Sequence, residues 1–155
     1  MNAPLFVSSP RIRQPGLNVL PENTERYRIR AGGSVTLGLL AGDELELVSP
    51  EGLQPAEISV FDPAGRGDPG LIGLPANGNC EALQGILADK MGNTANLADA
   101  LAALNISLQD ARSSAVFRNH SPAGDSIRCS ANEALTCIIV VPAEPMRADR
   151  QNTPT

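Results

Sequence analysis

LTCIIVV, residues 135–141, decides the fold, because its apolar residues run on without the alternation of a half-exposed strand. Val and Ile fit a pleated surface, so this run and AEISVFD (56–62) are predicted to be central strands buried on both faces. In DELELVS (43–49) polar and apolar residues alternate, which predicts a strand with one face exposed.

Shorter segments supply the other predicted strands and one loop. Further strands are expected at RYRIR (26–30), SVTLGLLA (34–41), SAVF (114–117) and DSIRCSA (125–131). Five glycines and two prolines in AGRGDPGLIGLPANGN (64–79) predict an irregular loop, which matches neither a dinucleotide-binding nor a P-loop pattern.

Two helices are predicted between this loop and residue 114. CEALQGILADKM (80–91) follows Asn79, a good N-cap, and precedes Gly92, which suits a left-handed C-terminal stop. Its apolar stripe consists of Leu83, Ile86 and Leu87. Thr94 or Asn96 would cap the second helix, whose apolar positions are Leu97, Leu101 and Leu104. The predicted fold is therefore α+β, a strand-dominated antiparallel body with a central pair of helices.

The chain divides into one domain and two flanking segments. Four prolines among polar residues predict an extended or mobile N-terminal arm over 1–23. The length of the chain suits a single globular domain, which we place over 24–146, followed by a linker-like tail over 147–155. The longest apolar stretch is far shorter than the ~20 residues of a membrane helix. The N-terminus does not have the pattern of a secretory signal, so we expect a cytoplasmic location.

Charge and composition exclude some partners. The chain carries 12 Lys plus Arg against 17 Asp plus Glu, a formal charge of −5, and only 3% aromatic residues. No basic run marks a path for a phosphate backbone, and stacking platforms for bases are scarce. Neither nucleic acid nor a membrane is an expected partner.

Cysteine and histidine raise two catalytic or metal hypotheses. Cys80 would begin a helix, where the helix dipole stabilises a thiolate, and His120 could serve as its base, although nothing in the sequence joins them. Cys129 and Cys137 flank a predicted hairpin turn and, with Cys80 and His120, could form a zinc site. No Cys-x-x-Cys spacing supports that site, so buried structural thiols and a loop histidine are the favoured interpretation.

A family resemblance rests on three stretches. They are AGDELELVSPEGLQPAEISVFDPAGRGD (41–68), FRNHSPAGDSIRC (117–129) and IIVVPAEPMRADRQNTPT (138–155). Together they resemble the N-terminal module of multidomain aminomethyltransferases, in which a urea-carboxylase-associated family domain precedes a glycine-cleavage T-protein-like domain, as in trimethylamine N-oxide demethylases. The resemblance covers roughly residues 26–155.

The resemblance implies a noncatalytic structural or interaction domain associated with a folate-dependent aminomethyltransferase or demethylase of small methylated amines. Its partner would be a downstream aminomethyltransferase domain or subunit. A homo-oligomer of this chain is a further possible assembly. Tetrahydrofolate would be bound there, and this chain would hold no cofactor. The interface residues that we expect are Asp62, Pro63, Ser121, Pro122, Gly124, Pro145 and Met146.

Two alternatives stay open. One is a zinc-dependent small-amine demethylase or deiminase-like enzyme of the same wider family. The metal-bearing relatives carry an Arg-His-Asp segment and a late Cys-Pro turn, whereas this chain has no His-Asp in GLPANGNCEALQG (73–85) and has Val141-Pro142-Ala143-Glu144 after the last strand. The other alternative is a standalone small-molecule binding domain.

Overall fold

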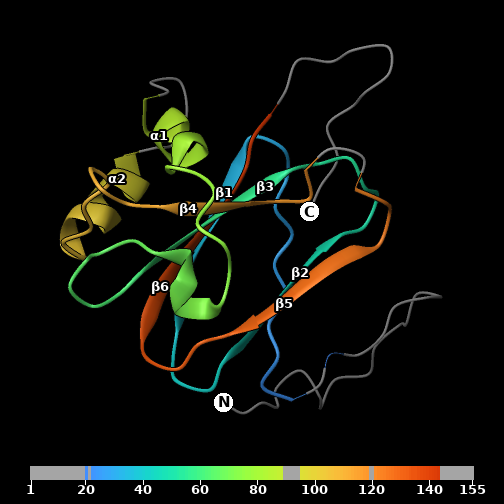
Figure 1. Cartoon of the computed structure of the whole chain (residues 1–155), viewed down its shortest axis with the longest axis horizontal. Coiled ribbons are helices and arrows are strands. Elements are labelled where there is room, and N and C mark those ends of the chain that lie inside the picture. The colour runs from blue at the N-terminus through green and yellow to red at the C-terminus, as the bar shows by residue number, and fades with distance from the viewer. Residues whose placement is uncertain (1–19, 21, 89–94, 119–120, 144–155) are drawn as a thin grey trace, which may run out of the picture.

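The computed structural model describes residues 20, 22–88, 95–118 and 121–143. They form an α+β fold dominated by antiparallel strands, which confirms the predicted fold class (Figure 1). The main sheet has the strand order β1-β6-β3-β4, and β2 and β5 form a separate two-stranded ribbon. The strands are β1 (Gly33–Leu39), β2 (Glu44–Ser49), β3 (Ala56–Phe61), β4 (Ser113–Val116), β5 (Asp125–Ser130) and β6 (Leu135–Val141). The helices are α1 (Glu81–Ala88), α2 (Ala95–Ala103) and the short 3₁₀ helix η2 (Pro69–Ile72).

β3 and β6 lie in the centre of the main sheet and are buried on both faces, as their apolar sequences predict. Every residue of β3 is buried, and Ile139 of β6 pairs with Ile58 of β3 on one side and Val35 of β1 on the other. One face of these strands contributes to a core shared with the ribbon, which includes Ile58 and Ile139. The opposite face packs beneath the helices through Phe61, Ile138 and Val140.

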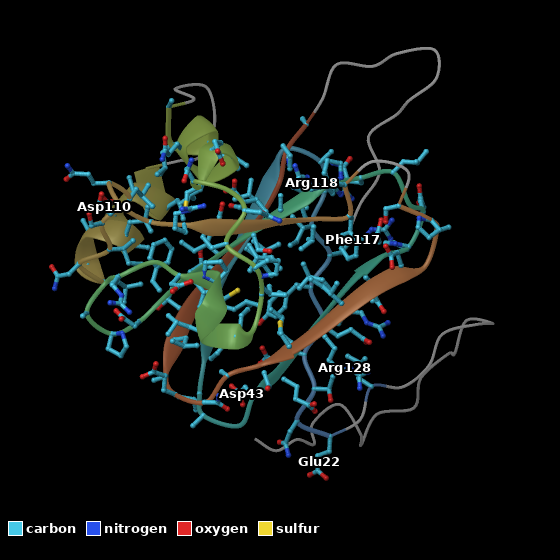
Figure 2. All side chains as sticks on the ribbon, in the orientation of Figure 1. Glu22, Asp43, Asp110, Phe117, Arg118 and Arg128 are labelled. Atoms are coloured by element: carbon cyan, nitrogen blue, oxygen red, sulfur yellow. The ribbon has the colours of Figure 1, made fainter. Side chains whose placement is uncertain are left out.

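The ribbon covers the face of the main sheet opposite the helices, and its alternation confirms the predicted half-buried strand. Leu47 of β2 pairs with Ile127 of β5, and both contribute to the shared core. Glu46 is exposed and accepts a 3.0 Å hydrogen bond from Arg128, which Figure 2 labels on the ribbon. Figure 1 shows the ribbon and the two helices on different sides of β3 and β6.

The helices differ from their predicted limits. Leu83 of α1 is fully buried, and Leu97 and Leu101 of α2 pack in the same cluster. Leu104 was predicted to share that face, but α2 ends at Ala103 and the Leu104 side chain is 44% exposed. Asn96 lies inside α2 and is not its cap, while Thr94 and Gly92 lie outside the described residues. Among the described residues, no helix is long and apolar enough to cross a membrane.

Two predicted strands need correction. RYRIR (26–30) forms no strand, because Ile29 alone of its side chains enters the core and Tyr27 is 52% exposed, which leaves no second anchor to hold a register. The strand predicted at 114–117 is β4, which ends at Val116. Phe117 leaves the ladder because its φ is +55°, although its side chain is buried.

Candidate functional site

A buried polar cluster joins the start of α1 to the main sheet. Glu57 of β3 is 6% exposed, and its carboxylate accepts hydrogen bonds of 3.0 Å from the backbone N–H groups of Ala82 and Leu83. It thereby replaces an N-cap side chain and lies where the helix dipole favours negative charge. The prediction of Asn79 as the N-cap is wrong. The first residue of α1 is Glu81, two positions after Asn79, and the helix is capped from the sheet.

Cys80 lies at the centre of this cluster and is fully buried. Its N–H donates to Ser113 Oγ at 2.9 Å, and Ser59 Oγ donates to its thiol at 3.4 Å. Burial raises the pKa of the Cys80 thiol; the Ser59 hydrogen bond opposes this rise and the charge of Glu57 adds to it. The thiolate expected at a helix start is therefore disfavoured here, first because the thiol is buried and also because the Glu57 carboxylate lies at the same end of the helix.

The hairpin predicted between Cys129 and Cys137 does not form, because the two cysteines lie on strands of different sheets. Cys129 on β5 pairs with Leu45 in the ribbon, whereas Cys137 on β6 pairs with Leu37 and Val60 in the main sheet. The link between them carries the chain from one sheet to the other. Burial raises the pKa of both thiols, that of Cys137 to about 12, and the neighbouring Cys129 contributes to the rise at Cys137.

The three cysteines belong to two different parts of the core. Cys80 packs in the cluster beneath the helices, and Cys129 and Cys137 pack between the main sheet and the ribbon. Within the described ranges, no group of three or more His, Cys, Asp or Glu side chains could hold a metal ion. His120 lies outside the described residues. The described thiols therefore do not fit the three-cysteine zinc site considered from sequence.

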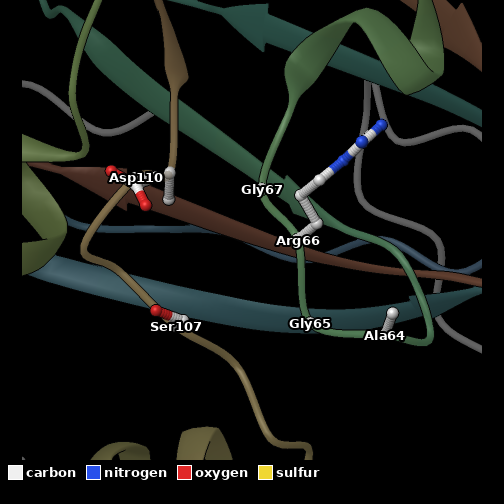
Figure 3. A pocket seen from close by; sticks show the side chains of 7 residues that line it. Ala64, Gly65, Arg66, Gly67, Ser107 and Asp110 are labelled. Carbon is white, nitrogen blue, oxygen red and sulfur yellow. The ribbon is translucent and has the colours of Figure 1, made fainter.

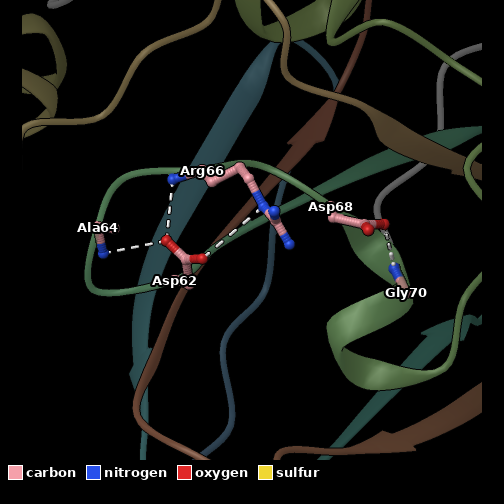
Figure 4. A network of polar contacts seen from close by, with 5 residues as sticks. All are labelled: Asp62, Ala64, Arg66, Asp68 and Gly70. Atoms are coloured by element: carbon pink, nitrogen blue, oxygen red, sulfur yellow. Dashed lines mark hydrogen bonds and ion pairs between the residues drawn. The ribbon is translucent and has the colours of Figure 1, made fainter.

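Asp62, an expected interface residue, closes its own turn (Figure 4). Its Oδ1 accepts hydrogen bonds from the N–H groups of Ala64 at 3.0 Å and Arg66 at 2.9 Å. Its Oδ2 lies 4.0 Å from Arg66 Nε, in an ion pair whose arginine is 76% exposed. The neighbouring Pro63 is exposed. The carboxylate is thus engaged by the loop, and Pro63 is the side chain of this pair that another molecule can reach.

A small open pocket of about 220 Å³ lies on the other side of the same loop (Figure 3). Residues 64–67 form one wall, and Ser107, Asp110 and Ala111 form the other. The walls are held together by a 3.3 Å hydrogen bond from the Ser107 N–H to the Gly65 carbonyl. The lining includes one basic residue, Arg66, and one acidic residue, Asp110, and Figure 3 shows the Arg66 side chain pointing away from Asp110. The pocket is smaller than the ~300–1,000 Å³ of typical ligand sites.

The turn formed by residues 121–125, hereafter the Ser121 turn, packs on the loop that joins β2 to β3. Ser121 is 5% exposed, and its Oγ donates to Asp125 Oδ2 at 2.9 Å. Its carbonyl accepts the Leu53 N–H at 3.0 Å. Pro122 and Gly124 are exposed. Of the expected interface residues here, Ser121 is therefore structural, while Pro122 and Gly124 are accessible; Pro145 and Met146 lie outside the described residues.

Sequence reasoning missed the Glu57 cap and the second wall of the pocket. Glu57 is 25 residues from Ala82 in the chain, so no local capping pattern reveals it. Arg66 lies in the glycine-rich loop predicted over 64–79, and Asp110 follows a helix in a polar link, so neither residue carries a signal of its own. Only the packing of the two loops, through the hydrogen bond from Ser107 to Gly65, places Arg66 and Asp110 in the lining of one pocket.

The fold and site therefore define an α+β module in which the carboxylates of Glu57 and Asp62 and the hydroxyl of Ser121 are engaged within the chain. Comparison with curated proteins matches 144 residues, 93% of this chain, at 33% identity to the trimethylamine-oxide aldolase of Ruegeria pomeroyi. The chain spans only 18% of that protein. No family model matches the chain, and no solved structure matches it.

Proposed function

We propose that this chain is a noncatalytic structural or interaction module of a folate-dependent aminomethyltransferase-type enzyme that acts on small methylated amines. The similarity to the trimethylamine-oxide aldolase carries the proposal, because it runs over 93% of this chain and 18% of the relative. A module of this kind leaves the chemistry to the much larger remainder of the enzyme. Tetrahydrofolate would be bound by that remainder.

The internal use of the polar side chains supports a noncatalytic role. Glu57 holds α1 on the sheet, Asp62 closes a turn and Ser121 pins the loop before β3. A catalytic acid or nucleophile needs access to substrate and a pKa matched to its task. Cys80 has neither, since it is fully buried and its thiol pKa is raised.

A chimera tests this function. The matched segment of the Ruegeria pomeroyi protein is deleted in one variant and replaced by this chain in a second, and turnover of trimethylamine N-oxide is measured for both. We expect deletion to lower turnover or abolish the soluble enzyme, and the replacement to restore it to within about tenfold of the parent. A folded, inactive chimera would contradict the proposal.

Zinc analysis of the purified 155-residue chain separates the module from the zinc-enzyme alternative. The dispersed thiols lead us to expect much less than one zinc per chain. One zinc per chain, lost in Cys129→Ala or Cys137→Ala, would favour the zinc-enzyme alternative, because a metal site would then exist in this chain.

The pocket beside Arg66 favours one second candidate, the binding of a small zwitterion. The residues that line its two walls include the basic Arg66 and the acidic Asp110. Trimethylamine N-oxide and related methylated amines can be tested by thermal shift against the chain and its Arg66→Ala variant. A ligand-dependent rise in Tm that Arg66→Ala removes would support this candidate, whereas no rise at millimolar ligand would exclude it.

A further inference from the structure

Leu53 is an exposed leucine held in a left-handed backbone conformation. Its φ is +61° and its side chain is 44% exposed. Leucine disfavours this conformation because its Cβ crowds the following carbonyl. At 44% exposure, the leucine also leaves apolar surface open to solvent. Strained residues of this kind persist where the surroundings impose them, and they cluster at binding surfaces.

The surroundings of Leu53 impose its conformation from both sides. The preceding Gly52 has φ +76°, and a Cβ at that position would lie 2.6 Å from the Ser121 carbonyl oxygen. The Leu53 N–H donates to the same carbonyl at 3.0 Å. The following Gln54 is 1% exposed and donates from Nε2 to the Pro142 carbonyl at 3.0 Å. Leu53 is therefore presented by a fixed loop, which lowers the entropy lost on binding.

Exposed apolar residues of the Ser121 turn extend this surface. Pro122 and Ala123 are exposed and lie against Gly52, since a Cβ on Gly52 would meet the backbone of both within 3 Å. Leu53, Pro122 and Ala123 together are called the corner surface below. All three residues of the corner surface are uncharged, which suits the centre of a contact from which water is excluded.

The path of the chain indicates what covers the corner surface. β6 ends at Val141, and the Gln54 hydrogen bond holds Pro142 beside the loop that carries Leu53. Pro142 and Ala143 are the last described residues of the chain, and the Gln54 hydrogen bond places them beside the corner surface. The relative extends far beyond the matched segment, which is 18% of its length. The remainder of such an enzyme is therefore the partner that we assign to this corner.

We propose that the corner surface docks the larger catalytic part of the enzyme, with Leu53 inserted into an apolar pocket of that part. This inference rests on the proposed function and adds the contact through which the module works. Leu53 contributes the central buried side chain, and Pro122 and Ala123 contribute the apolar surround. A rigid, preformed loop keeps this contact in one geometry.

Cysteine labelling tests the proposal, because all three native thiols are buried and an introduced surface thiol is selectively reactive. Leu53→Cys is compared with Leu104→Cys, a matched control that is also 44% exposed but follows α2 on the helical side. Ala123→Cys supplies a second position on the corner surface if Leu53→Cys does not fold. Each variant is labelled with a maleimide in the isolated chain and in the active chimera, and each labelled peptide is followed by mass spectrometry.

We expect the Leu53 and Leu104 variants to react at similar rates in the isolated chain. In the chimera, labelling at position 53 or 123 should slow at least tenfold while position 104 is unchanged. An active chimera with no slowing at 53 and 123 would overturn the docking surface and leave the proposed function intact. An inactive, folded chimera would overturn both. Slowing that appears in the isolated chain as its concentration rises would assign the surface to a second copy and overturn the assignment made here.

Discussion

Glu57 on β3 accepts a 3.0 Å hydrogen bond from the Leu83 N–H on α1 through its buried carboxylate. Its second oxygen accepts the Ala82 N–H at the same distance. One sheet residue therefore satisfies two of the N–H groups that a helix leaves without internal partners. This contact fixes the helical layer on the main sheet and explains why Cys80, next to it, is a structural thiol.

Removal of the Glu57 cap should destabilise the fold strongly. Glu57→Ala leaves two N–H groups unpaired, and we expect the free energy of unfolding to fall by about 3 kcal/mol. Glu57→Gln keeps one acceptor and should cost roughly half as much. Urea denaturation measures both. Glu46→Ala is the control, because it removes only the exposed pair with Arg128 and should cost less than about 1 kcal/mol. Equal losses at both positions would contradict the capping role.

The raised pKa of Cys137 should make stability fall in alkali. Below pH 9.0 the thiol holds its proton in both states; between 9.0 and about 12 the unfolded chain loses it and the folded chain does not. The free energy of unfolding should therefore decrease as pH rises through this window, by ~1.4 kcal/mol per pH unit for this thiol. Urea denaturation at several values from pH 8 to 10.5 measures the slope. Cys137→Ala should have a shallower slope, and an identical slope would count against the buried neutral thiol.

The contact between Gly52 and the Ser121 turn should tolerate no side chain. Gly52→Ala combines a positive φ with a Cβ placed 2.6 Å from a carbonyl oxygen. The control is Gly42→Ala, where φ is +94° but no atom lies within 4 Å. We expect Gly42→Ala to cost about 1–2 kcal/mol from the backbone alone, and Gly52→Ala to cost about 2 kcal/mol more. Thermal denaturation would contradict this packing if the two variants had the same Tm.

Leu53→Asn should stabilise the isolated chain. Asparagine adopts left-handed conformations more readily than leucine, so the variant should gain about 1 kcal/mol. For a chain of this size, that gain corresponds to a Tm increase of about 2–4 °C. Leu104→Asn removes an equally exposed leucine. Its Tm should change less, and a fall in Tm for Leu53→Asn would show that Leu53 is packed within the chain.

The fold could be predicted where burial alone decides the sequence. The apolar runs of β3 and β6 mark central strands, and the alternation of Glu44 to Leu47 marks the half-buried β2. RYRIR (26–30) has the same alternation, yet it has no strand partner among the described residues. Alternation records which side chains face inward, whereas a strand also needs a neighbour at hydrogen-bonding distance.

The site could be predicted less well because its contacts join distant parts of the chain. The link at 131–134 has the composition of a hairpin turn, but it carries the chain from the ribbon to the main sheet and so places Cys129 and Cys137 in different sheets. The Ser121 turn was recognised as a turn, while its packing against Gly52 and Leu53 depends on tertiary structure. The sequence places the turn, and the fold determines what it touches.

Turnover of trimethylamine N-oxide by the chimera tests the central claim most directly when its cysteines are changed one at a time. Cys80→Ala, Cys129→Ala and Cys137→Ala are measured well below the Tm of each variant, so that the fold is intact. A noncatalytic module predicts kcat and KM within about twofold of the unmodified chimera for all three. A loss of kcat greater than a hundredfold in any folded variant would contradict this function and place chemistry inside the chain.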